Sequence, residues 1–318
     1  MKSLQKRNIL ILLLLTACFC GNSQSFAAEP GKKVPQWVQH AFSVIEKQAQ
    51  KMSAKVEKTS CLPRSIQRGT VSPTDWTSGF FPGKEEWKAR AERATALLEM
   101  EQFNAFDHDI GFKMYCSYGN GWRLTRHPDY SKIIFRSAKT LSSRYSYKTG
   151  LIMSWEEDST RDWQFPVIID NMMNLELLME AYKLSGDTTL RHIALSHADK
   201  TMKCQYRENY SCPHVVDYDA ETGEVRKFDW NNGSDDVRVS TWARGQAWAI
   251  YGYTMAYRET KRKDFLDMAI HTADFWLNHP NLPEDGVPYW DFNAGQEGFV
   301  PDWNYDPQMF KEVPRDAS

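Results

Sequence analysis

The sequence predicts an all-α protein built from antiparallel helices, and three observations support this prediction. From about Pro35 onward, apolar residues recur at helical spacing in segments of roughly 14 to 20 residues. Short joints such as Ser185-Gly186-Asp187 connect segments, which places neighbouring helices antiparallel. The third observation is segment 170–185, where apolar residues cover nearly the whole circumference, as in a helix enclosed on every side.

Length and charge exclude few functions. The 318 residues suffice for one large domain or two ordinary ones. Charge is nearly balanced, with 39 basic and 41 acidic side chains, and no run of Lys or Arg suggests nucleic acid as a partner. The 12 Trp residues suit stacking against sugar rings, although core packing explains any single Trp equally well.

The N-terminus is typical of a secretory signal. The basic residues Lys2, Lys6 and Arg7 precede the apolar run 9–15, which is too short to span a bilayer. Cleavage would leave 36 basic against 41 acidic side chains, because it removes three basic residues and no acid.

Two processing sites are open, an ordinary signal-peptidase site after Ala28 and a bacterial lipoprotein site between Ala17 and Cys18. We therefore expect residues 1–28 to be a signal peptide and residues 33–318 to form the mature domain. The protein is then exported from a bacterium and is either periplasmic or lipid-anchored to the outer membrane. We expect no membrane insertion apart from such an anchor, and a monomer.

Helices are expected near residues 35–55, 84–102, 109–124, 129–146, 170–185, 187–206, 241–260 and 263–279. The only plausible β feature is a hairpin of segments 214–218 and 224–228, which could act as a lid. Cys204 and Cys212 could pair in an oxidising compartment. The chain stops at Asp316-Ala317-Ser318, residues that typically open a helix, so we expect a C-terminally truncated chain.

Asp170 lies at the start of the most apolar helix, after the short run Ile168-Ile169. Its structural role would be to cap the helix by accepting backbone N–H hydrogen bonds. The functional alternative is a carboxylic acid in a partly dry pocket, where lost solvation favours the protonated form and allows proton donation near neutrality.

A second carboxylate lies in Asp107-His108-Asp109, before a helix whose first turn contains Gly111. Glycine costs helix stability without packing anything, so it suggests a closely approached backbone. Asp107 or Asp109 could simply cap the helix. Asp109 and Asp170 both open helices after long loops, so they could face one pocket and perform acid–base work on a sugar.

Another mostly apolar helix opens with Arg244 and Trp248, which share a face because they are four residues apart. The guanidinium fits a carboxylate in two-point geometry. That carboxylate is either an internal Asp or Glu, or an acidic ligand whose ring stacks on Trp248. We find no phosphate loop, nucleophile elbow or metal-ligand set, and we expect no metal or cofactor.

Four motifs in order, DWTSGFFPG (75–83), HDIGF (108–112), IIDNMMNL (168–175) and WARGQAW (242–248), resemble the unsaturated glucuronyl hydrolases of glycoside hydrolase family 88. The resemblance implies an (α/α)6 barrel of six helical hairpins whose inner helices open onto a pocket. The expected helices are fewer than twelve, which also favours truncation. The implied substrate is an oligosaccharide left by a polysaccharide lyase, with a 4,5-unsaturated uronic acid at its non-reducing end.

By the same resemblance, Asp170 matches the family's catalytic acid and base, and Asp109 matches the second essential aspartate. The positions that match its substrate-binding residues are Trp76, Phe80, His108, Trp155, His214, Asn232, Arg244 and Trp248. Where relatives often have His-Gln-Gly, this chain has Asn231-Asn232-Gly233, which leaves the preferred sugar and sulfate pattern open. The alternatives are an unsaturated rhamnogalacturonyl hydrolase of pectin breakdown and a non-catalytic glycan-binding lipoprotein.

Overall fold

The computed structural model describes residues 36, 40, 43, 44, 47, 59, 61–65, 69–75, 88–229, 240–297 and 299. The predicted signal peptide, nearly all of the predicted helix 35–55, and the last residues of the chain lie outside this part.

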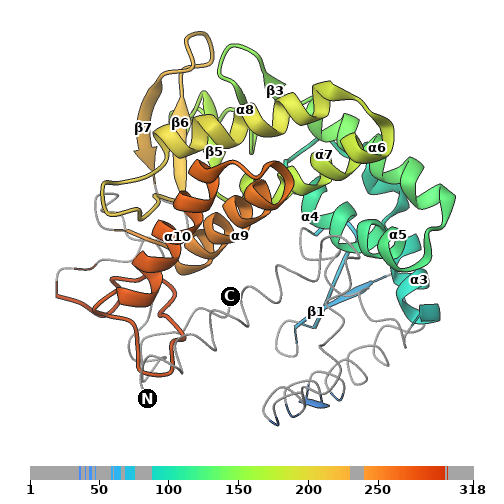
Figure 1. Cartoon of the computed structure of the whole chain (residues 1–318), viewed down its shortest axis with the longest axis horizontal. Coiled ribbons are helices and arrows are strands. Elements are labelled where there is room, and N and C mark those ends of the chain that lie inside the picture. Colours follow the sequence, from blue (N-terminus) through green and yellow to red (C-terminus); the bar gives the residue numbers. More distant parts are fainter. Residues whose placement is uncertain are drawn as a thin grey trace.

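The described residues form three helix pairs that follow one another along the chain. The pairs are α4 (Ile110–Met114), η4 (Tyr115–Gly119) and α5 (Asn120–Thr125) with α6 (Pro128–Ser142), then α7 (Asn171–Ser185) with α8 (Thr188–Cys204), then α9 (Ala243–Thr260) with α10 (Lys263–Asn278). Helix α7 contacts α4, α6, α8 and α9, so it is the central helix of this arrangement (Figure 1). The predicted all-α class is confirmed.

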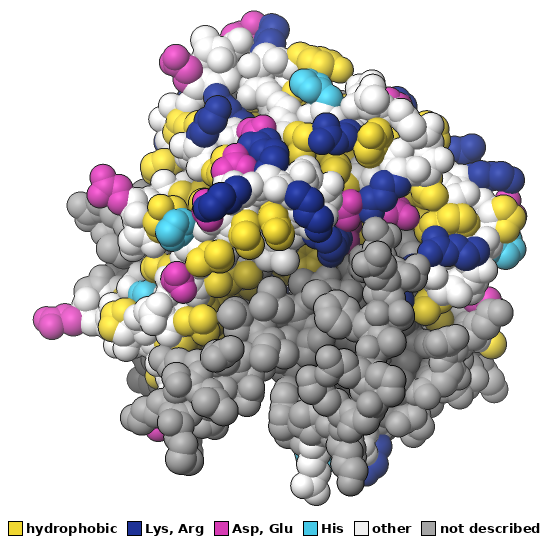
Figure 2. Space-filling view, in the orientation of Figure 1, with side chains coloured by type: hydrophobic (Ala, Val, Ile, Leu, Met, Phe, Trp, Pro, Cys, Tyr) yellow, Lys and Arg dark blue, Asp and Glu magenta, His cyan; other side chains and the backbone are white. Residues whose placement is uncertain are grey.

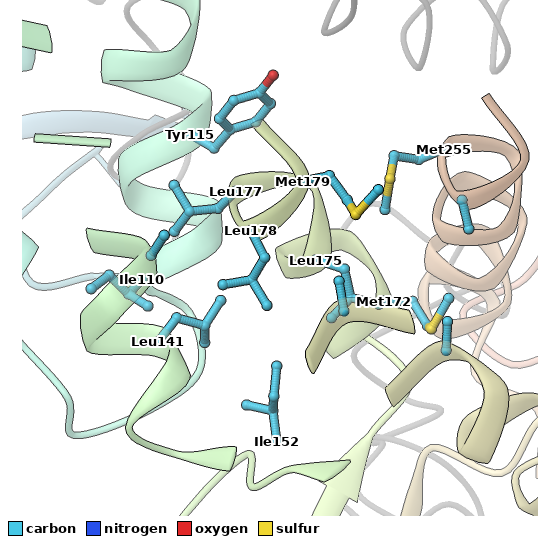
Figure 3. Packing of buried hydrophobic residues seen from close by; sticks show 14 of the residues in the cluster. Ile110, Tyr115, Leu141, Ile152, Met172, Leu175, Leu177, Leu178, Met179 and Met255 are labelled. Carbon is cyan, nitrogen blue, oxygen red and sulfur yellow. The ribbon is translucent and has the colours of Figure 1, made fainter. Parts of the chain in front are cut away.

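Helix α7 is enclosed as its all-round apolar pattern predicts. Its residues are buried without interruption from Asn171 to Met179. In Figure 3, Met179 points toward Met255 of α9, and Leu178 lies on the side of Leu141 of α6. The outer surface differs, because basic and acidic side chains are interspersed over the described part of the face in Figure 2.

The earlier helices depart from the predicted bounds. The predicted helix 84–102 is split into α3 (Lys88–Ala96) and a 3-10 helix, η3 (Glu99–Phe103), because the backbone tightens into i to i+3 hydrogen bonds at Leu98 and Glu101. The segment 109–124 is helical but contains one π-helical turn, η4. The segment 129–146 ends as a helix at Ser142, because β3 (Tyr145–Ser146) pairs with β4 (Leu151–Ile152).

The predicted hairpin is confirmed, but it is part of a larger sheet. β6 (Val215–Tyr218) pairs with β7 (Val225–Asp229) on one side and β5 (Phe165–Ile168) on the other, all antiparallel. Every residue of β6 is buried. The prediction that this hairpin is the only β feature is therefore wrong, as β1 (Leu62–Ser65) and β2 (Gly69–Val71) also show. A lid made of the hairpin is also wrong, because its first strand is central in the sheet.

The suggested pairing of Cys204 with Cys212 is wrong, since both thiols are free. Cys204 packs beside the cluster around Leu151 and Phe165, whereas Cys212 belongs to the central core. The Cys212 thiol lies 3.1 Å from Gln246 Oε1, and burial raises its pKa to about 12. Among the helices that the described residues form, none has the length and apolar character to cross a membrane.

Candidate active site

Asp170 lies between β5 and α7, in the short connection from the sheet to the central helix. Its predicted capping role is wrong, because its side chain makes no capping hydrogen bond. The reason is its backbone, which is already helical at φ −55° and ψ −27°, whereas a capping residue is extended. The residue is 8% exposed, and its Oδ1 lies 3.3 Å from Nε2 of His214. Among the described residues no donor makes a well-directed hydrogen bond to this oxygen.

Asp109 precedes α4 and likewise makes no capping hydrogen bond. Asp107 takes the backbone role instead, because its Oδ1 accepts the Asp109 N–H at 2.8 Å. The Asp109 carboxylate is left to pair with the neighbouring His108, whose Nε2 lies 3.2 Å from Asp109 Oδ1. Both aspartates therefore keep their carboxylates available beside a histidine.

His108 connects the two aspartates electrostatically. It is fully buried, and burial by itself lowers the pKa of an imidazole. The carboxylates of Asp109, Asp170 and Asp107 outweigh this effect, so the pKa of His108 is raised. Because the charges of Asp109 and Asp170 both raise the pKa of His108, the two carboxylates belong to one site around this imidazole.

Ser154 ties the loop of His108 to the strand that leads to Asp170. Its carbonyl accepts the His108 N–H at 3.2 Å, and its own N–H donates to Pro166 at 2.9 Å. Its hydroxyl accepts the Ile168 N–H at 2.9 Å and lies 3.2 Å from His108 Nδ1. Sequence reasoning missed this role, because a serine in a loop carries no pattern that identifies such partners.

The close backbone approach predicted at Gly111 is present. A Cβ at this position would lie 2.3 Å from Asn174 Oδ1 and 2.6 Å from Asn174 Cα. The same Oδ1 accepts the Phe112 N–H at 2.7 Å. Asn174 lies one helical turn after Asp170, so this contact joins the start of α4 to the start of α7.

Aromatic rings form one side of the site. Trp155 stacks on Trp163 with centroids 5.6 Å apart and meets His214 edge-on at 6.4 Å. His214 in turn lies 4.5 Å from Trp242. The Arg244 guanidinium lies 4.4 Å from the Trp242 ring, which extends the row with a cation.

Trp163 was not among the predicted site residues, although it anchors this row. Its Nε1 donates to Asp229 Oδ2 at 2.6 Å, from β7. Trp248 packs against a separate apolar cluster, edge-on to Phe112 at 5.0 Å between ring centroids. The structure thus brings His108, Asp109, Trp155, Asp170, His214 and Arg244 around one site. Trp76, Phe80 and Asn232 lie outside the described residues.

Within the described part of the chain, no group of three or more His, Cys, Asp or Glu side chains is arranged to hold a metal ion.

The residues that lead into α9 are held by the buried carboxylate of Asp291. Asp291 Oδ2 accepts the Thr241 N–H at 2.8 Å and the Ser240 hydroxyl at 3.0 Å. Burial raises the pKa of Asp291 to about 6, although these hydrogen bonds favour its ionised form.

No protein-family model matches the chain. Several solved structures are similar to it, among them two unsaturated glucuronyl hydrolases. The crystal structure of a heparin-specific unsaturated glucuronyl hydrolase is 39% identical, with a TM-score of 0.76, over 81% of this chain and 72% of that chain. An unsaturated glucuronyl hydrolase from Streptococcus agalactiae is 27% identical, with a TM-score of 0.72, over 85% and 72%.

Curated proteins are also similar to the chain in sequence. The unsaturated glucuronyl hydrolase of Bacillus sp. strain GL1 is 33% identical over 70% of this chain, and the chain spans 62% of that relative. The unsaturated glucuronyl hydrolase of Formosa agariphila is 42% identical over 98% of this chain and 78% of the relative. With this identity over nearly the whole chain, and with the fold shared by the solved structures, the chain belongs to the unsaturated glucuronyl hydrolase family.

Proposed function

We propose that this protein hydrates the 4,5 double bond of an unsaturated uronic acid at the non-reducing end of lyase-generated glycosaminoglycan oligosaccharides. The observation that carries the proposal is the Asp170 carboxylate, which is buried, unused for capping and 3.3 Å from His214. A relative named for this activity is 42% identical, which supports the same substrate class.

In the proposed reaction, the Asp170 carboxylic acid gives its proton to C4 of the double bond. Positive charge then develops at C5 and is shared with the ring oxygen. Water adds its hydroxyl to C5 and returns a proton to Asp170. The resulting hemiketal opens and releases the next sugar, so Asp170 serves first as acid and then as base.

The other residues bind and orient the substrate in this proposal. Asp109 lies in the same electrostatic site and positions the sugar beside Asp170. The row of Trp155, His214 and Trp242 offers aromatic faces to a sugar ring. Arg244 supplies the cation for the uronate carboxylate.

Loss of the ultraviolet absorbance of the conjugated double bond tests the proposal. The substrates are unsaturated disaccharides from chondroitin, heparin and rhamnogalacturonan. We expect decay with a glycosaminoglycan disaccharide, and a reduction by about 100-fold or more in Asp170→Asn, since the proton donor is lost.

The matched control is Asp187→Asn. Asp187 is the residue before α8 and does cap its helix, accepting the Thr189 N–H at 3.0 Å. Asparagine caps about as well as aspartate, so this variant should keep wild-type turnover. No decay with any disaccharide would refute the proposal, whereas decay only with the rhamnogalacturonan substrate would move the protein to pectin breakdown.

A further inference from the structure

Lys113 is a buried cation next to the candidate active site. It lies on α4, one helical turn after Asp109, and its side chain is fully buried. Lysine is almost never buried without a partner. Its ammonium lies 3.1 Å from Glu101 Oε2 and 3.8 Å from Asp107 Oδ1. The cation therefore lies between two carboxylates that the proposed reaction does not use.

The Asp107 oxygen near Lys113 has a second contact. The same Oδ1 accepts the Asp109 N–H at 2.8 Å. The Lys113 backbone N–H also donates to the Asp109 carbonyl at 2.9 Å. Lys113 thus contacts Asp109 directly through a backbone hydrogen bond. It also acts on the Asp109 amide indirectly, because its ammonium lies near the Asp107 oxygen that accepts from that amide.

The negative charges around His108 explain why a buried cation is needed near Asp107. Asp107, Asp109 and Asp170 all act on the buried His108, so three carboxylates lie within one electrostatic site. An anionic substrate adds a further negative charge. Without a buried cation, repulsion would favour rotation of the Asp107 carboxylate, and its hydrogen bond to the Asp109 amide would weaken.

We infer that Lys113 is a positioning residue, which keeps the Asp107 carboxylate in place so that Asp107 fixes the backbone and carboxylate of Asp109. The inference rests on the proposed function for its catalytic consequence. It assigns no contact between Lys113 and the substrate.

Lys113→Met tests the inference, because methionine keeps an unbranched apolar stem and removes the charge. Glu101→Gln is the matched control, since it weakens the ion pair between Lys113 and Glu101 and leaves the Lys113–Asp107 pair in place. The side-chain carbonyl of the substituted residue can still accept from Asn104, whose Nδ2 donates to Glu101 Oε2 at 2.8 Å. We expect both variants to lower the melting temperature.

Only Lys113→Met should change the reaction. We expect kcat to fall about tenfold, because a displaced Asp109 misplaces the substrate. Asp107→Asn should give a kcat similar to that of Lys113→Met. The Lys113→Met/Asp107→Asn double variant should lose no more kcat than either single variant, because both substitutions act through the Asp107 side chain.

Hydrogen exchange of the Asp109 amide provides a measurement that does not depend on activity. Lys113→Met should accelerate it about tenfold or more, whereas Glu101→Gln should leave it within about twofold of wild type. Unchanged protection of this amide in Lys113→Met overturns the inference. If Lys113→Met does not fold, Asp107→Ala takes its place, because it removes the acceptor at a partly exposed position. Wild-type kcat and wild-type protection of the Asp109 amide in Asp107→Ala overturn the inference equally. A wild type without turnover refutes the proposed function alone.

Discussion

At the scale of single residues, the site contains two histidine–aspartate pairs of similar geometry. His108 Nε2 lies 3.2 Å from Asp109, and His214 Nε2 lies 3.3 Å from Asp170. Each aspartate stands directly before a helix yet makes no capping bond. Asp109 and Asp170, which the sequence suggests as helix caps, thus pair with histidines in the structure.

The His108–Asp109 pair predicts a pH-dependent stability. The pKa of His108 is raised in the folded protein, so the pair's contribution is fully present below about pH 6.5 and is lost as pH rises through the raised value. Asp109→Asn should therefore lower the free energy of unfolding more at pH 6 than at pH 9. The difference should be on the order of 1 kcal/mol.

Urea unfolding at the two pH values measures this difference. Asp264→Asn is the control, because Asp264 pairs with Arg262 and has no histidine among the groups that shift its pKa. Its destabilisation should be the same at both pH values. A loss in Asp109→Asn that does not change with pH would contradict the assignment of the raised pKa to this pair.

At the scale of elements, α7 and α9 are joined by a buried polar network. Arg258 donates to Glu176 Oε1, and the Tyr251 hydroxyl donates to Glu176 Oε2. Glu176 is 2% exposed, and burial raises its pKa even though Arg258 and Tyr251 favour its ionised form. A carboxylate in this position is tolerated only with its partners.

Arg258→Met should therefore separate the two helices energetically. It leaves Glu176 buried without its cation, at a cost of about 3 kcal/mol in the free energy of unfolding, the low end for a broken buried pair because Arg258 is itself partly exposed. The loss should grow as pH rises, since the ionised form of Glu176 is the one that burial penalises. Adding Glu176→Gln should recover much of it.

Arg262→Met is the matched comparison. Arg262 pairs with Asp199 and Asp264 nearer the surface, so its loss should cost about 1 kcal/mol or less. Denaturant unfolding of the single variants and of the Arg258→Met/Glu176→Gln double variant measures the costs. Equal costs for the two arginines would show that the α7–α9 network is no more than a surface ion pair.

Elements also show what the sequence can predict. The segments 170–185, 187–206, 241–260 and 263–279 match the observed helices to within two residues, because each has a long helical apolar pattern and a clear joint. Strand β5 was missed, because Pro166 argues against a strand inside a sheet. It is tolerated since β5 lies at the edge of the sheet that the described strands form, with β6 as its one partner there.

The site residues likewise divide into those that the sequence predicts and those that only the structure shows. Motifs predicted Asp109, Asp170 and the residues beside them as site candidates, because those positions carry a family pattern. Ser154 and Trp163 carry none, and their partners lie far along the chain, as in the contact of Trp163 with Asp229. Roles that depend on such distant contacts follow only from the folded structure.

At the scale of the whole molecule, the helices that carry the site begin at it. Asp170 directly precedes α7, and Arg244 lies in the first turn of α9. His214 contacts both Asp170 and Trp242, so the two helix starts are close in space. Helix N-termini carry partial positive charge, which favours an anionic sugar at this end of the molecule.

We propose that the protein meets such a sugar outside the cytoplasm, since its first residues combine a basic start with a short apolar run. Deletion of residues 2–28 should keep it in the cytoplasm of a bacterial host. Cys18→Ser tests the lipoprotein exit, because the cysteine thiol is the atom that would carry the lipid.

Cell fractionation and detergent-phase partitioning measure the outcome. Loss of membrane association in Cys18→Ser, with Cys20→Ser unchanged as the matched control, would establish the lipid anchor. Soluble periplasmic protein in both variants and in the wild type would establish processing after Ala28 instead. An unchanged distribution after deletion of residues 2–28 would contradict export, and the substrate would then have to be imported before the protein could act on it.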